Sequence, residues 1–250
     1  MCIRDSSERR VRHVHVGHPA AGGIVHVAAV VFDPGKIAEG RFTRHRHGRH
    51  FPGALAVGAR PHFEKDLFSG GVLEEAVDAV IIDERFNGGG ALATDIIEFL
   101  QRKLLSLVAT RDGEDEAQPQ GAILGPKVML INEFAGSGGD AMPYYFKAAG
   151  VGPLIGKTTW GGLVGRAGGP ALMDGGFVTA PSSGVWSPKD GWIAENVGIA
   201  PDIEIEHDPA LVRRGKDPQL DKAIEVVMSE LTKKPPVKPK RPTFPDHYRK

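Results

Sequence analysis

Two stretches, VDAVIIDERFNGGG at residues 77–90 and KVMLINEFAGSGGD at residues 127–140, decide the fold. Each begins with a continuous apolar run, which is typical of a strand buried on both faces of a sheet. Each run ends in a glycine-rich loop. The residues after the first loop have the apolar spacing of a helix, and a second helix is expected after the second loop. This alternation of strand and helix predicts an α/β domain.

The remaining elements follow from local signals. The first helix is expected over Ala91–Val108 and the second over Gly139–Gly150, with Pro143 in its first turn. A last helix should begin at Asp217-Pro218, because aspartate is a good cap and proline suits the first helical position. The polar stretch Arg111–Gly121 reads as a loop. Short strands are expected at Leu154–Ile155, Phe177–Ala180 and Ile203–Glu206.

Composition excludes several classes of protein. The 250 residues are enough for one large or two small domains. Lys+Arg and Asp+Glu both number 31, so no net charge favours binding to nucleic acid or acidic lipid. No apolar run approaches the roughly 20 residues needed to cross a bilayer, and the N-terminus lacks the layout of a secretory signal. We therefore expect no membrane segment and a cytoplasmic location. Cys2 is the sole cysteine, so no internal disulfide can form.

The chain divides into three parts by composition. Eight of the 10 histidines lie at or before His62, and residues 41–50 follow neither a strand nor a helix period. The opening MCIRDS looks like translated sequencing adapter. Residues 1–75 are therefore expected to be an irregular segment arising from a frameshift or adapter artefact. The alternative is a genuine flexible segment with a short strand at Gly23–Phe32. Residues 76–232 form the predicted domain, and residues 233–250 an exposed Pro/Lys-rich tail.

The N-terminal histidines form two clusters that are candidate metal sites. His13 and His15 alternate as on a strand, and His45, His47 and His50 lie close together. A zinc site needs three or four ligands on a rigid frame, whereas the neighbouring arginines here would repel a dication. The sequence therefore predicts no metal and no cofactor.

The stretch Asn132–Asp140 carries the most informative candidate residue, Ser137. A serine between a buried strand and a helix is exposed by the turn, and the Gly138 amide points toward the helix N-terminus, where an oxyanion is stabilised. An amide of Gly88 or Gly89 could complete the oxyanion hole, because loops at strand carboxyl ends share one sheet edge. From the Ser137 motif alone, a plain glycine turn with Ser137 as helix cap is the favoured interpretation, and the Gly88–Gly89 loop is equally consistent with a helix entry that binds no ligand.

A third candidate is Glu195, which precedes the turn in ENVGIAPD at residues 195–202. A carboxylate in such a position could orient a catalytic histidine, as in a serine triad. On spacing alone, an exposed loop glutamate is the favoured interpretation.

Taken together, DERFNGGG, NEFAGSGGD, LIGKTTWGGLVG and ENVGIAPDIEIE resemble, in content and order, the C-terminal catalytic domain of tricorn-type peptidases. These belong to the tail-specific serine peptidases, family S41, and the resemblance covers about Val77 to Leu231. It implies a ClpP/crotonase-like α/β core with a mixed sheet and flanking helices. It also implies Ser137 as nucleophile, an oxyanion hole from Gly138, Gly88 and Gly89, and Glu195 supporting a histidine. The implied substrates are peptides, cleaved through an acyl-enzyme without metal or nucleotide.

Two departures from the family pattern matter. The family histidine and its partner serine come from a separate upstream domain that this chain is too short to contain, and His207 occupies no catalytic position of the family. We therefore expect a fragment with little activity by itself and a homo-oligomer when full length. Archaeal tricorn has aspartate where this chain has Gly138, so a preference for basic substrates is not carried over. The alternatives are a non-catalytic peptide-binding or assembly module and a crotonase-type acyl-CoA enzyme.

Overall fold

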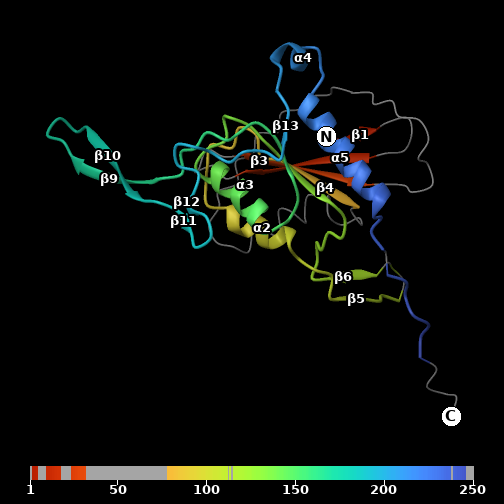
Figure 1. The fold of residues 1–250 in the computed structure, drawn as a ribbon. Coiled ribbons are helices and arrows are strands. Elements are labelled where there is room, and N and C mark those ends of the chain that lie inside the picture. Colours follow the sequence, from red (N-terminus) through yellow and green to blue (C-terminus); the bar gives the residue numbers. More distant parts are fainter. Residues whose placement is uncertain are drawn as a thin grey trace.

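A mixed sheet lies at the centre of the part of the chain that the computed structural model describes, which is residues 2–4, 10–17, 24–31 and 78–245 except 112, 114 and 238. The sheet has seven strands in the order β1-β2-β3-β4-β7-β8-β13 (Figure 1). β1 to β4 pair antiparallel, whereas β4, β7, β8 and β13 run parallel. The strands are β1 (Cys2–Arg4), β2 (Arg10–Gly17), β3 (Ile24–Val31), β4 (Ala79–Asp83), β7 (Lys127–Ile131), β8 (Leu154–Gly156) and β13 (Ile203–Glu204).

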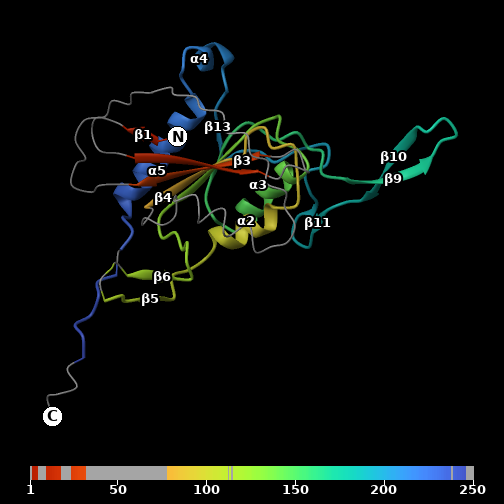
Figure 2. The same cartoon turned by 180° about the vertical axis from the view of Figure 1, so that it is seen from behind.

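Helices cover both faces of this sheet. α2 (Ala93–Leu100) and α3 (Gly138–Ala148) lie on one face, and α5 (Pro218–Lys233) lies on the other (Figures 1 and 2). Side chains alternate along a strand, so β4 supplies both cores. Its Val80 and Ile82 pack toward α2 and α3, and its Ala79 and Ile81 pack toward α5. The predicted α/β class with mixed sheet and flanking helices is confirmed, and the ClpP/crotonase-like label stays a prediction.

The last helix begins where the sequence predicted. Asp217 caps α5 by accepting a hydrogen bond from the Leu220 N–H at 3.1 Å, and Pro218 occupies the first helical position. A short helix, α4 (Pro209–Arg213), precedes it and is capped in the same way by Asp208. Among the described residues, no helix is long and apolar enough to span a bilayer.

Three two-stranded hairpins lie outside the central sheet, and the longest projects far from the domain body (Figures 1 and 2). This long hairpin joins β9 (Gly165–Ala171) to β10 (Phe177–Ser183), and every residue of β10 is exposed. The shorter hairpins are β5 (Ser106–Val108) with β6 (Glu116–Gln118), and β11 (Trp186–Ser187) with β12 (Gly191–Trp192).

Two expectations about helices were wrong. The first helix ends at Leu100 rather than Val108, because Ser106–Val108 pairs as β5 with β6 inside the stretch expected to be a loop. Pro143 lies in the second turn of α3 rather than in its first. Proline lacks an N–H, so one intrahelical bond of α3 cannot form there.

Residues 1–75 contain β1, β2 and β3, and β3 lies within the Gly23–Phe32 range considered as a strand. β3 pairs antiparallel with β4 and so joins the sheet of the domain. The other residues of this segment, including His45, His47 and His50, lie outside the described residues. The artefact hypothesis and the boundaries of the three parts remain predictions. Between Lys234 and residue 245 the described residues form no helix or strand.

Candidate active site

Ser137 occupies a strained corner between β7 and α3. It is the N-cap residue of α3, with φ 56° and ψ −114°. Phe86, Ala194 and Asn196 are the other non-glycine residues with positive φ among those described. Phe86, Ser137 and Asn196 lie on the three loops that the sequence singled out, and Ala194 immediately precedes the third of them. Such conformations cost about 1–3 kcal/mol each and concentrate at functional sites, where surrounding contacts hold them.

The two glycine loops meet at this corner, as predicted from their positions at the carboxyl ends of parallel strands. A Cβ added to Gly89 would lie 2.8 Å from Ser137 Cβ and 3.0 Å from Ser137 Oγ. A Cβ on Gly138 would overlap the Gly90 carbonyl oxygen, and one on Gly139 would overlap the Asn87 carbonyl oxygen. These contacts explain the glycines, because any side chain would push the loops apart.

The backbone amides beside Ser137 differ in availability. Within the described residues, the N–H groups of Gly138 and Gly88 donate to no acceptor. The Gly89 N–H instead donates to Asn87 Oδ1 at 3.0 Å. Gly138 is also the first residue of α3, where unpaired N–H groups and the helix dipole favour a negative charge. Gly138 and Gly88 can therefore donate to an oxyanion, and Gly89 sets the spacing to Ser137.

Asp140 holds the two segments around Ser137 together through hydrogen bonds to its carboxylate. The sequence analysis did not predict this role. The Asp140 side chain is fully buried. Its carboxylate accepts the Ser137 N–H at 2.9 Å and the Thr159 hydroxyl at 2.5 Å. It also accepts the N–H groups of Gly161 at 2.8 Å and Gly162 at 2.9 Å. An acidic residue three positions after a helix-capping serine is a known start signal and could have pointed to Asp140.

Glu195 lies on the third loop and is half-buried. Its Oε2 accepts the backbone N–H groups of Leu163 and Val164, both at 2.8 Å. The preceding Gly162 carbonyl accepts the Ser137 N–H at 3.1 Å, so Glu195 holds the segment that borders the serine. Its Oε1 has no partner among the described residues and is free to accept a further hydrogen bond.

Trp160 covers the same corner from the solvent side. A Cβ on Gly136 would lie 2.7 Å from its ring, and one on Gly162 would overlap the ring. The Trp160 N–H donates to the Ala135 carbonyl at 2.8 Å, yet the residue stays 70% exposed. The exposed indole is therefore an apolar surface on the segments that border Ser137.

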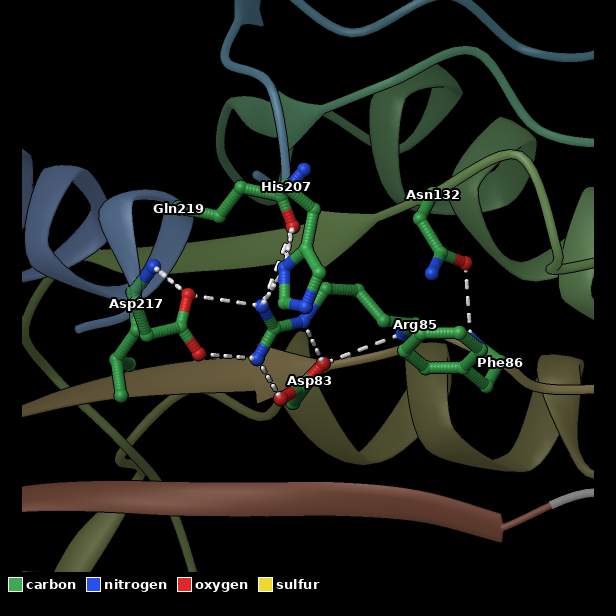
Figure 3. A network of polar contacts seen from close by, with 8 residues as sticks. Asp83, Arg85, Phe86, Asn132, His207, Asp217 and Gln219 are labelled. Carbon is green, nitrogen blue, oxygen red and sulfur yellow. Dashed lines mark hydrogen bonds and ion pairs between the residues drawn. The ribbon is translucent and has the colours of Figure 1, made fainter. Parts of the chain in front are cut away.

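A second polar network ties the first glycine loop to α5 (Figure 3). The Arg85 guanidinium bonds Asp83 through Nε at 2.8 Å and Nη2 at 2.6 Å. Two further bonds of 3.0 Å reach the Asp217 carboxylate. His207 Nδ1 lies 3.1 Å from Arg85 Nη1 and 3.2 Å from Gln219 Oε1. His207 therefore belongs to this structural network, and none of its contacts involves Ser137.

Metal ligation has no support in the part of the chain that the structure describes. No group of three or more His, Cys, Asp or Glu side chains is arranged there to hold an ion. For His13 and His15, which lie on β2, only the backbone is described.

Known proteins resemble this chain over the region that contains the corner. The tricorn protease of Thermoplasma volcanium is 41% identical over 162 residues, which are 65% of this chain and 16% of the relative. Tricorn protease homolog 1 of Streptomyces coelicolor is 36% identical over 173 residues, 69% of this chain and 16% of the relative. The chain thus spans about a sixth of the length of these relatives.

Solved structures show the same likeness. The crystal structure of the tricorn protease superimposes with a TM-score of 0.61 at 40% identity, covering 64% of this chain and 16% of that one. Mature CPAF superimposes with a TM-score of 0.54 over 93% of this chain and 56% of its own, and at 16% identity the likeness concerns the fold alone. Because the model of peptidase family S41 matches residues 65–205, more than half of the chain, the protein belongs to that family.

Proposed function

We propose that this chain is the nucleophile-bearing part of a tricorn-type serine peptidase that cleaves peptides through an acyl-enzyme on Ser137. The observation that carries the proposal is the corner itself. Ser137 is held at φ 56° with Gly89 against its side chain and the unpaired Gly138 N–H beside it. Membership of peptidase family S41 supports the same reaction class.

In the proposed reaction, Ser137 Oγ attacks the carbonyl carbon of the scissile peptide bond and transfers its proton to a base. The N–H groups of Gly138 and Gly88 stabilise the negative charge on the carbonyl oxygen. The tetrahedral intermediate expels the amine, which takes the proton from the base, and leaves an ester on Ser137. Water then attacks the ester carbonyl and gives its proton to the same base. The intermediate collapses with the base returning that proton to Ser137 Oγ, which releases the acid and free Ser137.

The base is proposed to be a histidine from polypeptide outside the described residues. His207 is engaged with Arg85 and Gln219 and so is not used. Glu195 is proposed to support the incoming imidazole through Oε1, since Oε2 is occupied by two backbone N–H groups. Without that imidazole Ser137 stays protonated, so the 250-residue chain alone should be almost inactive.

The test supplies the missing base as free imidazole. The 250-residue chain is incubated with a fluorophosphonate probe, and the modified residue is identified by mass spectrometry. Labelling of Ser137 should be slow and should accelerate about tenfold or more with added imidazole, because a general base contributes at least that much. Ser137→Ala should abolish it. Imidazole-dependent labelling that persists in Ser137→Ala, or none at Ser137, would contradict the proposal and favour a peptide-binding module or acyl-CoA enzyme.

We also propose that the full-length protein assembles from identical subunits. The exposed apolar side chains of the long hairpin, Leu172, Phe177 and Val178, support this, because such side chains are normally covered by a partner. Light scattering after size-exclusion chromatography of the full-length protein should give a mass of more than one subunit. A monomer at micromolar concentration would contradict this proposal.

A further inference from the structure

Glu84 is a buried acid directly beneath the proposed active site, and the reaction described above does not use it. It follows β4 and continues the ladder, with its N–H donating to the Leu130 carbonyl at 2.9 Å. Alternation along the strand turns Glu84 to the side of Val80 and Ile82, which is the side of α2 and α3. Its exposed fraction is 0%.

Glu84 makes one side-chain hydrogen bond, and that bond fixes Asn87. Its Oε1 accepts Asn87 Nδ2 at 2.7 Å, and Asn87 Oδ1 accepts the Gly89 N–H at 3.0 Å. The Glu84 acceptor thereby decides which end of the Asn87 amide faces Gly89, since the flipped amide would lose both bonds. The Asn87 carbonyl also accepts the Gly136 N–H at 2.9 Å, so Asn87 links the two glycine loops.

We propose that Glu84 is a positioning residue that acts through Asn87 to hold the Gly88–Gly90 loop against Ser137. The proposal rests on the function proposed above for Ser137. Gly89 is the point of contact, because its Cα faces Ser137 Cβ and Oγ so closely that no side chain fits between them. A shift of the Asn87 amide would therefore move the Gly88 N–H relative to the carbonyl oxygen that it serves.

The charge state of Glu84 determines whether this arrangement helps the reaction. Burial raises the pKa of Glu84 well above its ordinary value, the Asn87 hydrogen bond opposes this, and the nearby Asp83 and Asp140 raise it further. The Arg85 guanidinium is turned away toward Asp83 and Asp217. Burial therefore favours the protonated, neutral form of Glu84. Its Oε2 has no hydrogen-bond partner among the described residues.

Ionisation of Glu84 would oppose catalysis. It would place a second buried anion near Asp140, below the loop whose amides face the developing oxyanion. Reaction at Ser137 should therefore slow as the pH rises through the raised pKa of Glu84. Glutamine at this position keeps an oxygen acceptor for Asn87 but cannot ionise. Leucine keeps similar volume and removes the acceptor.

The experiment compares Glu84→Gln and Glu84→Leu with the wild type in the 250-residue chain. The first measurement is hydrogen exchange at the Gly89 amide, which needs no chemistry at Ser137. We expect Glu84→Leu to accelerate this exchange about tenfold, because the bond to Asn87 is no longer held, and Glu84→Gln to stay within about twofold. The second is imidazole-assisted labelling of Ser137, which should fall by up to about 10²-fold in Glu84→Leu only.

Unchanged Gly89 exchange in Glu84→Leu would overturn the proposal, as would equal loss of labelling in both variants. If Glu84→Leu fails to fold, the pH profile decides. Relative to Glu84→Gln, wild-type labelling must decline as the pH rises, and parallel profiles would overturn the proposal. If the wild type shows no labelling at Ser137, the proposed function fails, while the exchange data still decide whether Glu84 positions the loop.

Discussion

Replacing Arg85 by methionine should strongly destabilise the fold, because it leaves two carboxylates without their cation. The Arg85 side chain is 8% exposed and pairs with Asp83 at 2.6 Å and Asp217 at 3.0 Å, whose side chains are 24% and 13% exposed. Removing one partner of such a buried pair typically costs 3–5 kcal/mol. Because both carboxylates keep some access to water, we expect a loss of about 3 kcal/mol in the free energy of unfolding at pH 7.

The destabilisation caused by Arg85→Met should also depend on pH. Burial tends to raise the pKa of Asp217, but the hydrogen bond and charge of Arg85 outweigh it and lower the pKa. A lowered folded-state pKa contributes stability above the unfolded pKa, and this contribution is lost as the pH falls through the folded pKa. In Arg85→Met that contribution is absent, so the difference between variant and wild type should shrink as the pH falls below about 4.

The assay is urea unfolding of the 250-residue chain, followed by tryptophan fluorescence at pH 7 and at acidic pH. Arg213→Met is the matched control, because Arg213 is an exposed residue in the last turn of α4, and we expect a change within about 0.5 kcal/mol. A loss below about 1 kcal/mol for Arg85→Met at pH 7 would refute the reasoning. A loss of equal size at every pH would refute the electrostatic part of it.

Three further predictions concern the corner itself. Gly89→Ala should lower the free energy of unfolding by about 1–3 kcal/mol because of its φ of 122°, and its Cβ should abolish Ser137 labelling by clashing with that side chain. Gly175→Ala is the control, because Gly175 has a φ of 82° but open space around it. It should show the same loss of stability without loss of labelling. Asp140→Asn should lower the free energy of unfolding by about 3 kcal/mol or more in urea titrations, because its NH₂ would face N–H donors, and a change below about 1 kcal/mol would contradict this. Glu195→Gln should change the free energy of unfolding by less than about 1 kcal/mol, since one amide oxygen can still accept both N–H groups. It should nevertheless lower kcat of the assembled peptidase by about 10²-fold or more. An unchanged kcat would show that Glu195 takes no part in the reaction.

Much of the central sheet and α5 could be predicted from local sequence, because burial leaves a pattern there. The runs in β4 and β7 are apolar on both faces, and Asp217-Pro218 marks the start of α5. β9 escaped prediction because none of its residues, GRAGGPA, whose side chains the structure describes is buried, and the sequence shows no apolar alternation. The end of α2 escaped it because the apolar spacing continues past Leu100, and pairing of β5 with β6 decides against a longer helix.

For the candidate active site, the sequence predicted the loops but not the contacts that hold them. The meeting of Gly89 with Ser137 follows from two parallel strands ending at one edge of the sheet. The local capping pattern marks Asp140 and short-range bonds join Asn87 to Glu84 and Gly89, but the bonds from Asp140 to Gly161 and from the Asn87 carbonyl to Gly136 reach about 20 to 50 positions along the chain, and no local pattern encodes these. The burial of Glu84 could not be predicted for a different reason. A charged residue after an apolar run normally indicates that the buried strand has ended, but the Glu84 side chain is itself buried.

The backbone angles of Ser137 also predict which residue should replace it in related proteins that are no longer selected for the serine hydroxyl. At φ 56° and ψ −114° the side chain is a burden on the folded chain, and glycine would fit there at no steric cost. A descendant that no longer needs the hydroxyl would therefore gain stability from Ser137→Gly, while the surrounding glycines would still be required by their packing. Among related sequences, glycine at this position beside an intact Gly89 and Asp140 would mark lineages that kept the fold and lost the proposed nucleophile.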